Sequence, residues 1–211
     1  MKVSVSILSN KYNTKDLIDK LNNSVCDYIH LDIMDGVYVE TKTWTIGEIK
    51  KLSKIIHKPL DIHLMVKNPL KYIDAFSLLN SSFITFHSGS VKDIPYVISI
   101  IKSYGIKVGL ALNPDEDISL IEQYLPLIDL VLVMAVKPGK CGQPFNDEIV
   151  VKVDKLKEII DANNYNLIIS VDGGINNETA LLLNKADMLV SASYVQENIN
   201  ENIHTLLDID K

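Results

Sequence analysis

The hydrophobic positions of this chain follow two patterns that alternate along its length. Short runs of β-branched and aliphatic residues recur, and each is typical of a buried β-strand. Between these runs the apolar residues recur every three or four positions, which predicts amphipathic helices. The expected strands are Val3–Leu8, Tyr28–Ile33, Leu60–Val66, Phe83–His87, Lys107–Leu112, Leu130–Val136, Leu167–Val171 and Met188–Ser191.

Several helical segments also carry residues that start or stop a helix. Side-chain oxygens of Thr and Asn can cap a first turn, proline is tolerated there, and glycine commonly follows a last turn. The resulting predictions are Thr14 as N-cap before Leu17 and Leu21, an apolar stripe over Ile46–Ile56, Pro69 opening Leu70–Leu79, Gly105 ending Asp93–Tyr104, and Asn176 or Asn177 capping Glu178–Asn184.

The alternation of strands and helices predicts a parallel sheet. Eight units in 211 residues leave about 26 residues each, enough for a strand, a helix and two short loops. We therefore expect one α/β domain over residues 1–211, a single (β/α)8 TIM barrel. The alternative is an open doubly wound sheet. That fold more often has a G-x-G-x-x-G turn after its first strand, and Leu8-Ser9-Asn10 has no such turn.

Composition narrows the possible partners. Apolar residues make up 47% of the chain and the net charge is −6, so the sequence can bury a core and is not typical of a disordered protein. A pI near 5.3 argues against nucleic acid. All 21 basic residues are Lys, so a phosphate site would use backbone N–H groups or lysine.

The sequence also indicates a compartment. Cys26 and Cys141 are too few for a disulfide scaffold and suit a reducing environment. We find no signal peptide at the N-terminus and no apolar run near the roughly 20 residues of a membrane span. We expect a cytoplasmic protein with no membrane partner.

Candidate chemistry lies at the ends of the predicted strands, where barrel enzymes hold their reactive groups. His30 and Asp32 are two positions apart and share one face of a strand. His63 and Asp172 would enter from two other strands. Two imidazoles and two carboxylates suit a divalent transition metal. Their spacing matches no metal signature, so the alternative of satisfied polar core residues stays open.

A glycine pair, Gly173-Gly174, follows the seventh strand, and small residues follow the eighth. In (β/α)8 enzymes these two turns often hold a phosphate through backbone N–H groups and the N-terminus of a short helix. That arrangement would suit a chain without arginine. The alternative is that the glycines only form a tight turn.

These residues carry a family resemblance. The chain resembles the ribulose-phosphate 3-epimerase family in segments that run in order from the first strand to the eighth. The H-x-D-x-M-D-G and H-L-M-V segments are the most specific. The matching segments are Ser6–Ser9, His30–Gly36, Pro59–Val66, Asn113-Pro114, Val133-Met134, Pro138-Gly139, Gly142-Gln143 and Val171–Asn176.

The resemblance implies a (β/α)8 enzyme that interconverts D-ribulose 5-phosphate and D-xylulose 5-phosphate, a reaction of the pentose phosphate pathway. It implies His30, Asp32, His63 and Asp172 as metal ligands, with Asp32 and Asp172 also as the catalytic acid and base. It implies one divalent metal, with zinc first and iron, manganese or cobalt as alternatives, no organic cofactor, and a homo-oligomer. The implied substrate-binding residues are Ser6, Met34, His63, Met65, Met134, Gly139, Lys140, Cys141, Gly142, Gly173, Gly174, Ala192 and Ser193.

The residue types suit this chemistry. Inverting a carbon beside a ketone requires removal of its proton and return of a proton to the opposite face, which two carboxylates can do. A Lewis acid would stabilise the resulting enediolate. The methionines are also compatible with ordinary core filling. His87 and Asp61 either fix the imidazoles from behind or are merely polar core groups.

The chain departs from the family pattern in its loops, which leaves the substrate open. The usual P-G-F-G-G-Q is replaced by Pro138–Gln143 with Lys140 and Cys141, and Ala192 stands where a glycine is usual, so we expect altered phosphate geometry. Cys141 is either a reactive thiol or an incidental small residue. One alternative is a D-allulose-6-phosphate 3-epimerase, because Gly142–Phe145 resembles the corresponding segment of those relatives. A second is a lyase of the same superfamily, although the D-x-K-x-x-D segment of those enzymes is absent here. A third is a non-catalytic sugar-phosphate binder.

Overall fold

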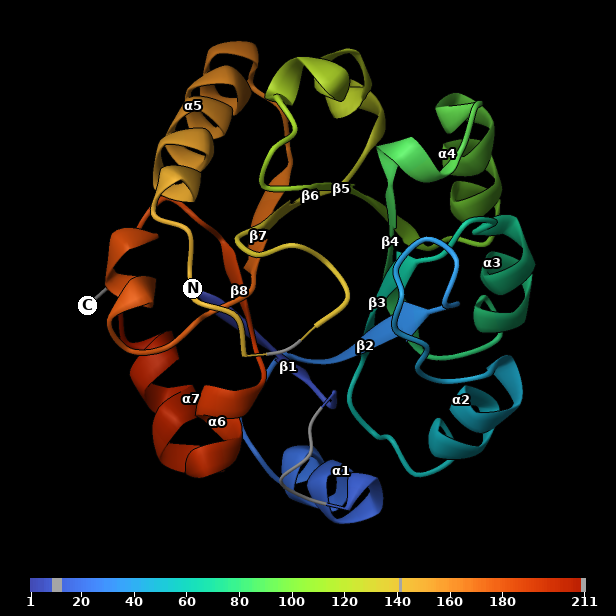
Figure 1. The fold of residues 1–211 in the computed structure, drawn as a ribbon, viewed down its shortest axis with the longest axis vertical. Helices are drawn as coiled ribbons and strands as arrows, with labels where there is room; N and C mark the ends of the chain where they lie inside the picture. The colour runs from blue at the N-terminus through green and yellow to red at the C-terminus, as the bar shows by residue number, and fades with distance from the viewer. Residues whose placement is uncertain (9–12, 141, 210–211) are drawn as a thin grey trace.

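The fold is a closed barrel of eight parallel strands surrounded by helices (Figure 1). The computed structural model describes residues 1–8, 13–140 and 142–209. Each strand pairs in parallel with the next along the chain, and the eighth closes on the first. This confirms the predicted (β/α)8 TIM barrel. The strands are β1 (Lys2–Ser6), β2 (Tyr28–Met34), β3 (Leu60–Met65), β4 (Ser81–His87), β5 (Lys107–Leu112), β6 (Leu130–Met134), β7 (Ile168–Asp172) and β8 (Met188–Ser191).

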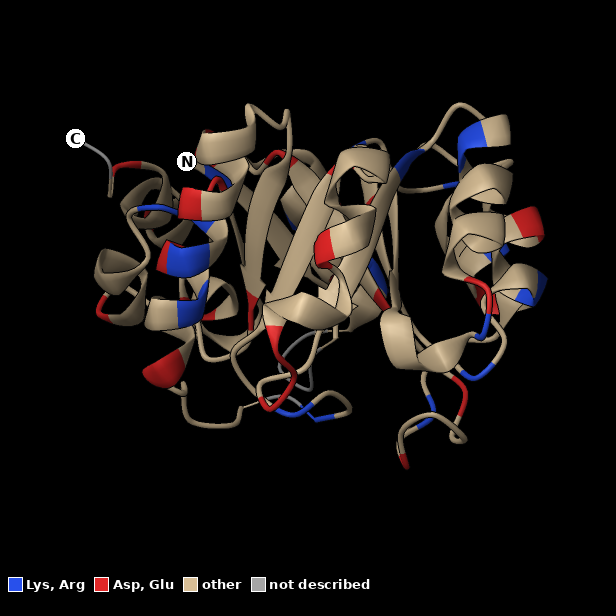
Figure 2. Ribbon diagram, turned by 90° about the horizontal axis from the view of Figure 1, so that it is seen from above, with Lys and Arg blue, Asp and Glu red and all other residues tan. Residues whose placement is uncertain are grey.

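The helices cover the outer face of the barrel, and Figure 2 shows most charged residues on their outer surfaces and in the loops. The α-helices are α1 (Thr14–Asn22), α2 (Ile46–Leu52), α3 (Leu70–Phe76), α4 (Ile94–Ser103), α5 (Glu148–Asn163), α6 (Ser193–Glu197) and α7 (Ile199–Leu207). Short 3₁₀ segments are η1 (Ser88–Ser90), η2 (Ile118–Leu120), η3 (Glu122–Leu127) and η4 (Thr179–Leu182). In the part of the chain that is described, no helix is long and apolar enough to cross a membrane.

Four helix predictions need correction. Helix α2 ends at Leu52, so Ile55 and Ile56 of the predicted stripe lie beyond it. The N-cap of α1 is Asn13, whose side chain accepts from the Lys15 N–H, and Thr14 is already helical. Helix α3 ends at Phe76, because Leu78 is 81% exposed and is not part of the buried stripe. The segment after Asn176 forms only η4, although Asn176 does accept hydrogen bonds from the N–H groups of the first turn, as predicted.

Some strands are shorter than their apolar runs. The run that starts with β6 continues through Ala135 and Val136, but the pairing ends at Met134. Both extra residues are buried, and the Ala135 N–H donates to the Asp172 carbonyl. Burial therefore extends past the strand ends because the loops pack on one another, and an apolar run alone does not mark the end of a strand.

The barrel has two apolar layers. Residues that point outward from the strands pack against the helices and form the main core. The inside of the barrel is apolar on one side only, where Phe83, Ala111, Leu130, Leu132, Met134, Met188 and Val190 pack together. Strands β1 to β4 instead send mostly polar side chains inward, and this polar half holds most of the candidate site.

Candidate active site

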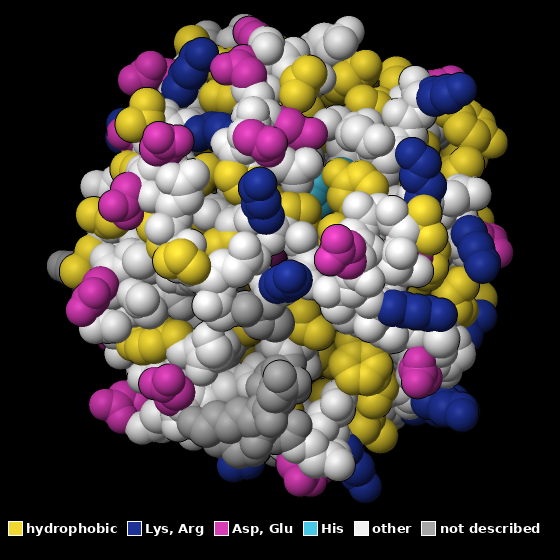
Figure 3. All heavy atoms as spheres, viewed as in Figure 1, with side chains coloured by type: hydrophobic (Ala, Val, Ile, Leu, Met, Phe, Trp, Pro, Cys, Tyr) yellow, Lys and Arg dark blue, Asp and Glu magenta, His cyan; other side chains and the backbone are white. Residues whose placement is uncertain are grey.

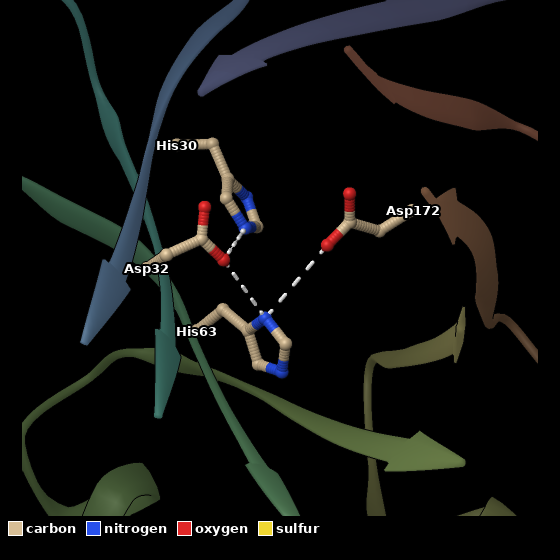
Figure 4. Close-up of side chains that lie close together, drawn as sticks. All are labelled: His30, Asp32, His63 and Asp172. Carbon is tan, nitrogen blue, oxygen red and sulfur yellow. Dashed lines mark hydrogen bonds and ion pairs between the residues drawn. The ribbon is translucent and has the colours of Figure 1, made fainter. Parts of the chain in front are cut away.

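Four predicted residues meet inside the barrel. His30 and Asp32 lie on β2, His63 on β3, and Asp172 at the end of β7. Figure 4 shows Asp172 facing the other three side chains from the opposite strand. One ligand atom from each residue lies within 4.8 Å of every other. Period-two alternation explains the placement, since His30 and Asp32 share the inward face of β2.

The shortest separations surround Asp32. Its Oδ1 lies 3.3 Å from His30 Nε2 and 3.2 Å from His63 Nδ1. Two ligands of one tetrahedral zinc ion, each about 2.1 Å from the metal, are about 3.4 Å apart. Asp172 Oδ2 lies further out, 3.9 Å from His63 Nδ1. The set therefore has the donor types of a divalent metal centre, with Asp32 and the two imidazoles at the spacing of ligands to one ion and Asp172 further out.

Three of these four groups, His30, Asp32 and His63, are held by a polar side chain behind them. His30 Nδ1 lies 2.7 Å from Asp61 Oδ2, and the Ser4 hydroxyl donates to the same oxygen at 2.8 Å. The Ser6 hydroxyl donates to Asp32 Oδ2 at 2.7 Å, so Oδ1 is left facing the imidazoles. His63 Nε2 lies 2.8 Å from His87 Nε2. Such partners fix the orientation of ligating groups.

The surroundings shift the pKa values of the two carboxylates, Asp32 and Asp172, in opposite directions. Burial alone would raise the pKa of Asp32, but the charges and hydrogen bonds of His30 and His63 outweigh it and hold that pKa well below its usual range. Burial and the nearby Asp32 carboxylate raise the pKa of Asp172 to about 6. Burial acts to lower the pKa of His30, but Asp32 and Asp61 hold it well above its usual value. Burial and His63 lower the pKa of His87.

A cavity of about 360 Å³ opens above this cluster. Figure 3 shows the molecular face hollowed near its centre, with Lys side chains at the edge of the hollow. His63 does not line the cavity and is fully buried, and Cys141 lies outside the described residues. All other predicted substrate-binding residues do line it, namely Ser6, Met34, Met65, Met134, Gly139, Lys140, Gly142, Gly173, Gly174, Ala192 and Ser193.

The two glycines after β7 are required by the local backbone. Gly173 and Gly174 have φ angles of +110° and +66°. A Cβ on Gly173 would lie 2.5 Å from a Val136 methyl group, and one on Gly174 would lie 2.9 Å from the backbone of Phe145. The turn and its close packing are thus sufficient to explain why these residues are glycines. That both glycines also line the cavity is a separate observation, and it is the one that bears on phosphate binding.

Ala192 does not adopt the left-handed backbone conformation that favours glycine. Its φ is −117°, which any residue adopts, so this position does not need the left-handed backbone that glycine favours. Ala192 is followed directly by α6. The departure from glycine is therefore compatible with the same turn.

Sequence reasoning left Asp61 unassigned and overlooked Ser4. The role of Asp61 follows from the register of β2 and β3, which pairs His30 with Asp61 and Asp32 with His63. An H-x-D strand beside a D-x-H strand places an imidazole next to a carboxylate twice. Ser4 is two positions before Ser6 and so shares its inward face.

Comparisons with known proteins agree with this geometry. The profile of the Ribulose-phosphate 3 epimerase family matches residues 2–196. Ribulose-phosphate 3-epimerase of Methanocaldococcus jannaschii is 40% identical over 198 residues, which are 92% of this chain and 84% of that protein. The Helicobacter pylori enzyme of the same name is 36% identical over 201 residues, which are 94% of this chain and 92% of that protein.

A solved structure of 3-hexulose-6-phosphate synthase from Salmonella typhimurium superposes with a TM-score of 0.68 and covers 100% of this chain and 98% of that one. At 14% sequence identity this likeness shows a shared fold alone. The family profile and the relatives named above are stronger evidence of family membership, since their matches span nearly the whole chain. The chain therefore belongs to the ribulose-phosphate 3-epimerase family, and it is an isomerase.

Proposed function

We propose that the protein is a divalent-metal-dependent epimerase that inverts C3 of a ketopentose phosphate and interconverts D-ribulose 5-phosphate and D-xylulose 5-phosphate. The observation that carries the proposal is the cluster of His30, Asp32, His63 and Asp172, of which Asp32 and Asp172 line the cavity. The names of the close relatives support the choice of substrate.

One buried atom supports the metal site in particular. Among the described residues, His30 Nε2 has no hydrogen-bond partner, although its imidazole is fully buried. Since Asp61 accepts at Nδ1, an ion that displaces the second proton of His30 would be bound by the Nε2 lone pair. His30, Asp32, His63 and Asp172 would hold that ion, with zinc as our first expectation. When bound, it would act as a Lewis acid that stabilises negative charge developing on the ketose oxygens.

Asp32 and Asp172 would move the protons. Inversion at C3 needs one group on each face of the carbon, and these two carboxylates enter from β2 and β7. The hydrogen bond from Ser6 fixes the orientation of Asp32. The methionines that line the cavity, Met34, Met65 and Met134, would cover the reacting carbon with apolar surface and exclude bulk water.

The other end of the cavity would hold the phosphate. Gly173, Gly174, Ala192 and Ser193 line the cavity from the turns after β7 and β8. Backbone N–H groups can bind an anion without arginine. Lys140 lies at the edge of the same cavity and would add positive charge.

We expect the protein to be a homo-oligomer in the cytoplasm. Sedimentation analysis of the purified protein would test the oligomeric state.

Proton exchange tests the reaction and the substrate together. Zinc-loaded protein is incubated in D2O with ribulose 5-phosphate and, separately, with allulose 6-phosphate. We expect deuterium at C3 of the pentulose phosphate, with much slower exchange in the hexulose phosphate. Exchange in the hexulose phosphate alone would replace the proposed substrate with a six-carbon one. Absence of exchange in both would overturn the epimerase assignment for this metal.

The Asp172→Asn variant tests the proposed proton carrier. Because acid–base catalysis by one positioned group contributes about 10²–10⁴-fold, we expect the exchange rate to fall at least about 100-fold while the protein stays folded. The zinc content of each sample is measured, since Asp172 is also a proposed ligand. The matched control is Asp16→Asn, an exposed carboxylate on α1 that should exchange at the unchanged rate. An active Asp172→Asn variant would show that another group carries the proton.

A further inference from the structure

The two ring nitrogens of His63 face different chemistry. Nδ1 faces the cluster, 3.2 Å from Asp32 Oδ1 and 3.9 Å from Asp172 Oδ2. Nε2 points the other way and lies 2.8 Å from Nε2 of His87, at the end of β4. The two imidazole rings are tilted by 30°, with centroids 5.0 Å apart. His63 is therefore held between a candidate metal site and a second histidine.

Two nitrogen atoms 2.8 Å apart form a hydrogen bond only if one of them carries the proton between them. A neutral imidazole has one N–H and one lone pair. If His63 presents its Nδ1 lone pair to an ion, its proton must be on Nε2, and His87 Nε2 must accept it. The proton of His87 is then on Nδ1, a buried atom without a hydrogen-bond partner among the described residues, and binding of the ion would have to offset that cost. The metal-loaded state thus fixes the tautomers of both rings.

We propose that His87 is a positioning residue for the metal centre: it accepts the Nε2 proton of His63 and so keeps the Nδ1 lone pair of His63 directed at the ion. The inference rests on the proposed metal site. It assigns His87 a role in metal affinity, without contact between His87 and the substrate.

His87 is enclosed by the protein. Its side chain is fully buried, and the Tyr38 ring lies over it with centroids 5.0 Å apart. Tyr38 comes from the loop after β2 and covers His87 at the end of β4. Because His63 is itself fully buried, its N–H would lose the partner it has in this structure if His87 were removed. A buried N–H without a partner costs about 1–3 kcal/mol, and His63 would lose its fixed orientation.

An imidazole also suits the charge of the site. Two carboxylates, Asp32 and Asp172, face the proposed ion, and a third, Asp61, lies behind His30. His30 uses one of them, Asp61, as its acceptor. A further carboxylate behind His63 would add negative charge that a single dication does not balance. His87 supplies a hydrogen-bond acceptor and adds no negative charge.

Cobalt(II) binding tests the proposal without relying on turnover. We would titrate the metal-free protein with Co²⁺, follow the visible absorption, and measure affinity by competition with a chelator. His87→Phe keeps a planar ring and removes the acceptor, whereas His87→Gln restores an acceptor. The matched control is Thr85→Val, a substitution of similar size at a buried inward position on the same strand.

We expect His87→Phe to bind Co²⁺ about 10–100-fold more weakly, as is typical when the partner of a ligating histidine is lost. His87→Gln should lie closer to the unchanged protein, and Thr85→Val should match it. If His87→Phe bound as tightly as the unchanged protein, or if His87→Gln were as weak as His87→Phe, the positioning role would be excluded. If the unchanged protein bound no Co²⁺, the metal site itself would fail first.

A measurement on the unmutated protein covers the case in which His87→Phe does not fold. The chain has five histidines, so ¹⁵N-histidine spectra of the zinc-loaded protein are simple to assign. We expect His63 protonated at Nε2 and His87 protonated at Nδ1. A His87 ring protonated at Nε2 would be the donor of the pair, and this result would overturn the proposal.

Discussion

At the scale of single residues, Asp35 joins two loops at the mouth of the barrel. Its Oδ1 accepts from the backbone N–H groups of Val37 and Tyr38, at 2.8 and 2.9 Å, and its Oδ2 accepts from that of Lys67 at 2.8 Å. Partial burial acts to raise the pKa of Asp35, but these hydrogen bonds lower it below its usual value. The carboxylate therefore stabilises the fold above the unfolded pKa of about 3.9, and this contribution is lost as the pH falls through the lower, folded pKa.

Asp35→Asn should lower the free energy of unfolding at pH 7 by about 1–2 kcal/mol, because the amide cannot accept on both sides and leaves one N–H group without its partner. The difference from the unchanged protein should shrink as the pH falls below about 4. Urea unfolding at pH 7 and pH 3 measures both values. Asp147→Asn is the control, since Asp147 is exposed and its side chain makes no capping hydrogen bond. A difference that stays the same at both pH values would contradict this account.

At the scale of elements, the connection from β5 to β6 has only η2 and η3 where the barrel pattern has a helix. Helix α5 compensates through Lys152, whose Nζ donates to the carbonyl oxygens of Asn113, Pro114 and Glu116 at 3.1, 2.8 and 2.6 Å. We expect Lys152→Met, which keeps the length of the side chain, to lower the free energy of unfolding by about 1.5–3 kcal/mol. Lys155→Met, at an exposed position of the same helix, should change it little. Urea unfolding measures both values. Equal losses of unfolding free energy in the two variants would show that the hydrogen bonds of Lys152 do not stabilise this connection.

The elements also show how far the sequence predicts the molecule. Strand composition located all eight strands, because buried parallel strands are continuous apolar runs. The α1 cap was placed one residue late, because Asn13 and Thr14 can both accept and only the backbone (ψ 134° at Asn13) decides between them. The four clustered residues were predicted from the family likeness and the strand positions. For His87 the sequence left a positioning role and a plain core role open, because the register pairs His63 with Thr85 and the His63–His87 contact is diagonal.

At the scale of the whole molecule, the proposed ion would join β2, β3 and β7, which are far apart in the sequence. The unfolded chain cannot gather these ligands, so an ion that binds the folded state should stabilise the entire barrel. With free zinc at about 100 times its dissociation constant, we expect about 2.7 kcal/mol, which corresponds to a rise in Tm of about 5–11 °C for a domain of this size. Thermal unfolding with zinc and with a chelator measures the shift.

Two variants separate the buried cluster from surface histidines as the source of that shift. Asp172→Asn removes a ligand whose side chain is 18% exposed, a substitution that the fold should tolerate, and it should lose most of the zinc-dependent rise in Tm. His57 and His204 are exposed and lie outside the cluster, so a protein with both replaced by Gln should keep the full rise. The opposite pattern, a rise that survives Asp172→Asn and disappears with the surface histidines, would show that zinc binds outside the barrel. The cavity floor would then lack the ion on which the proposed epimerisation depends.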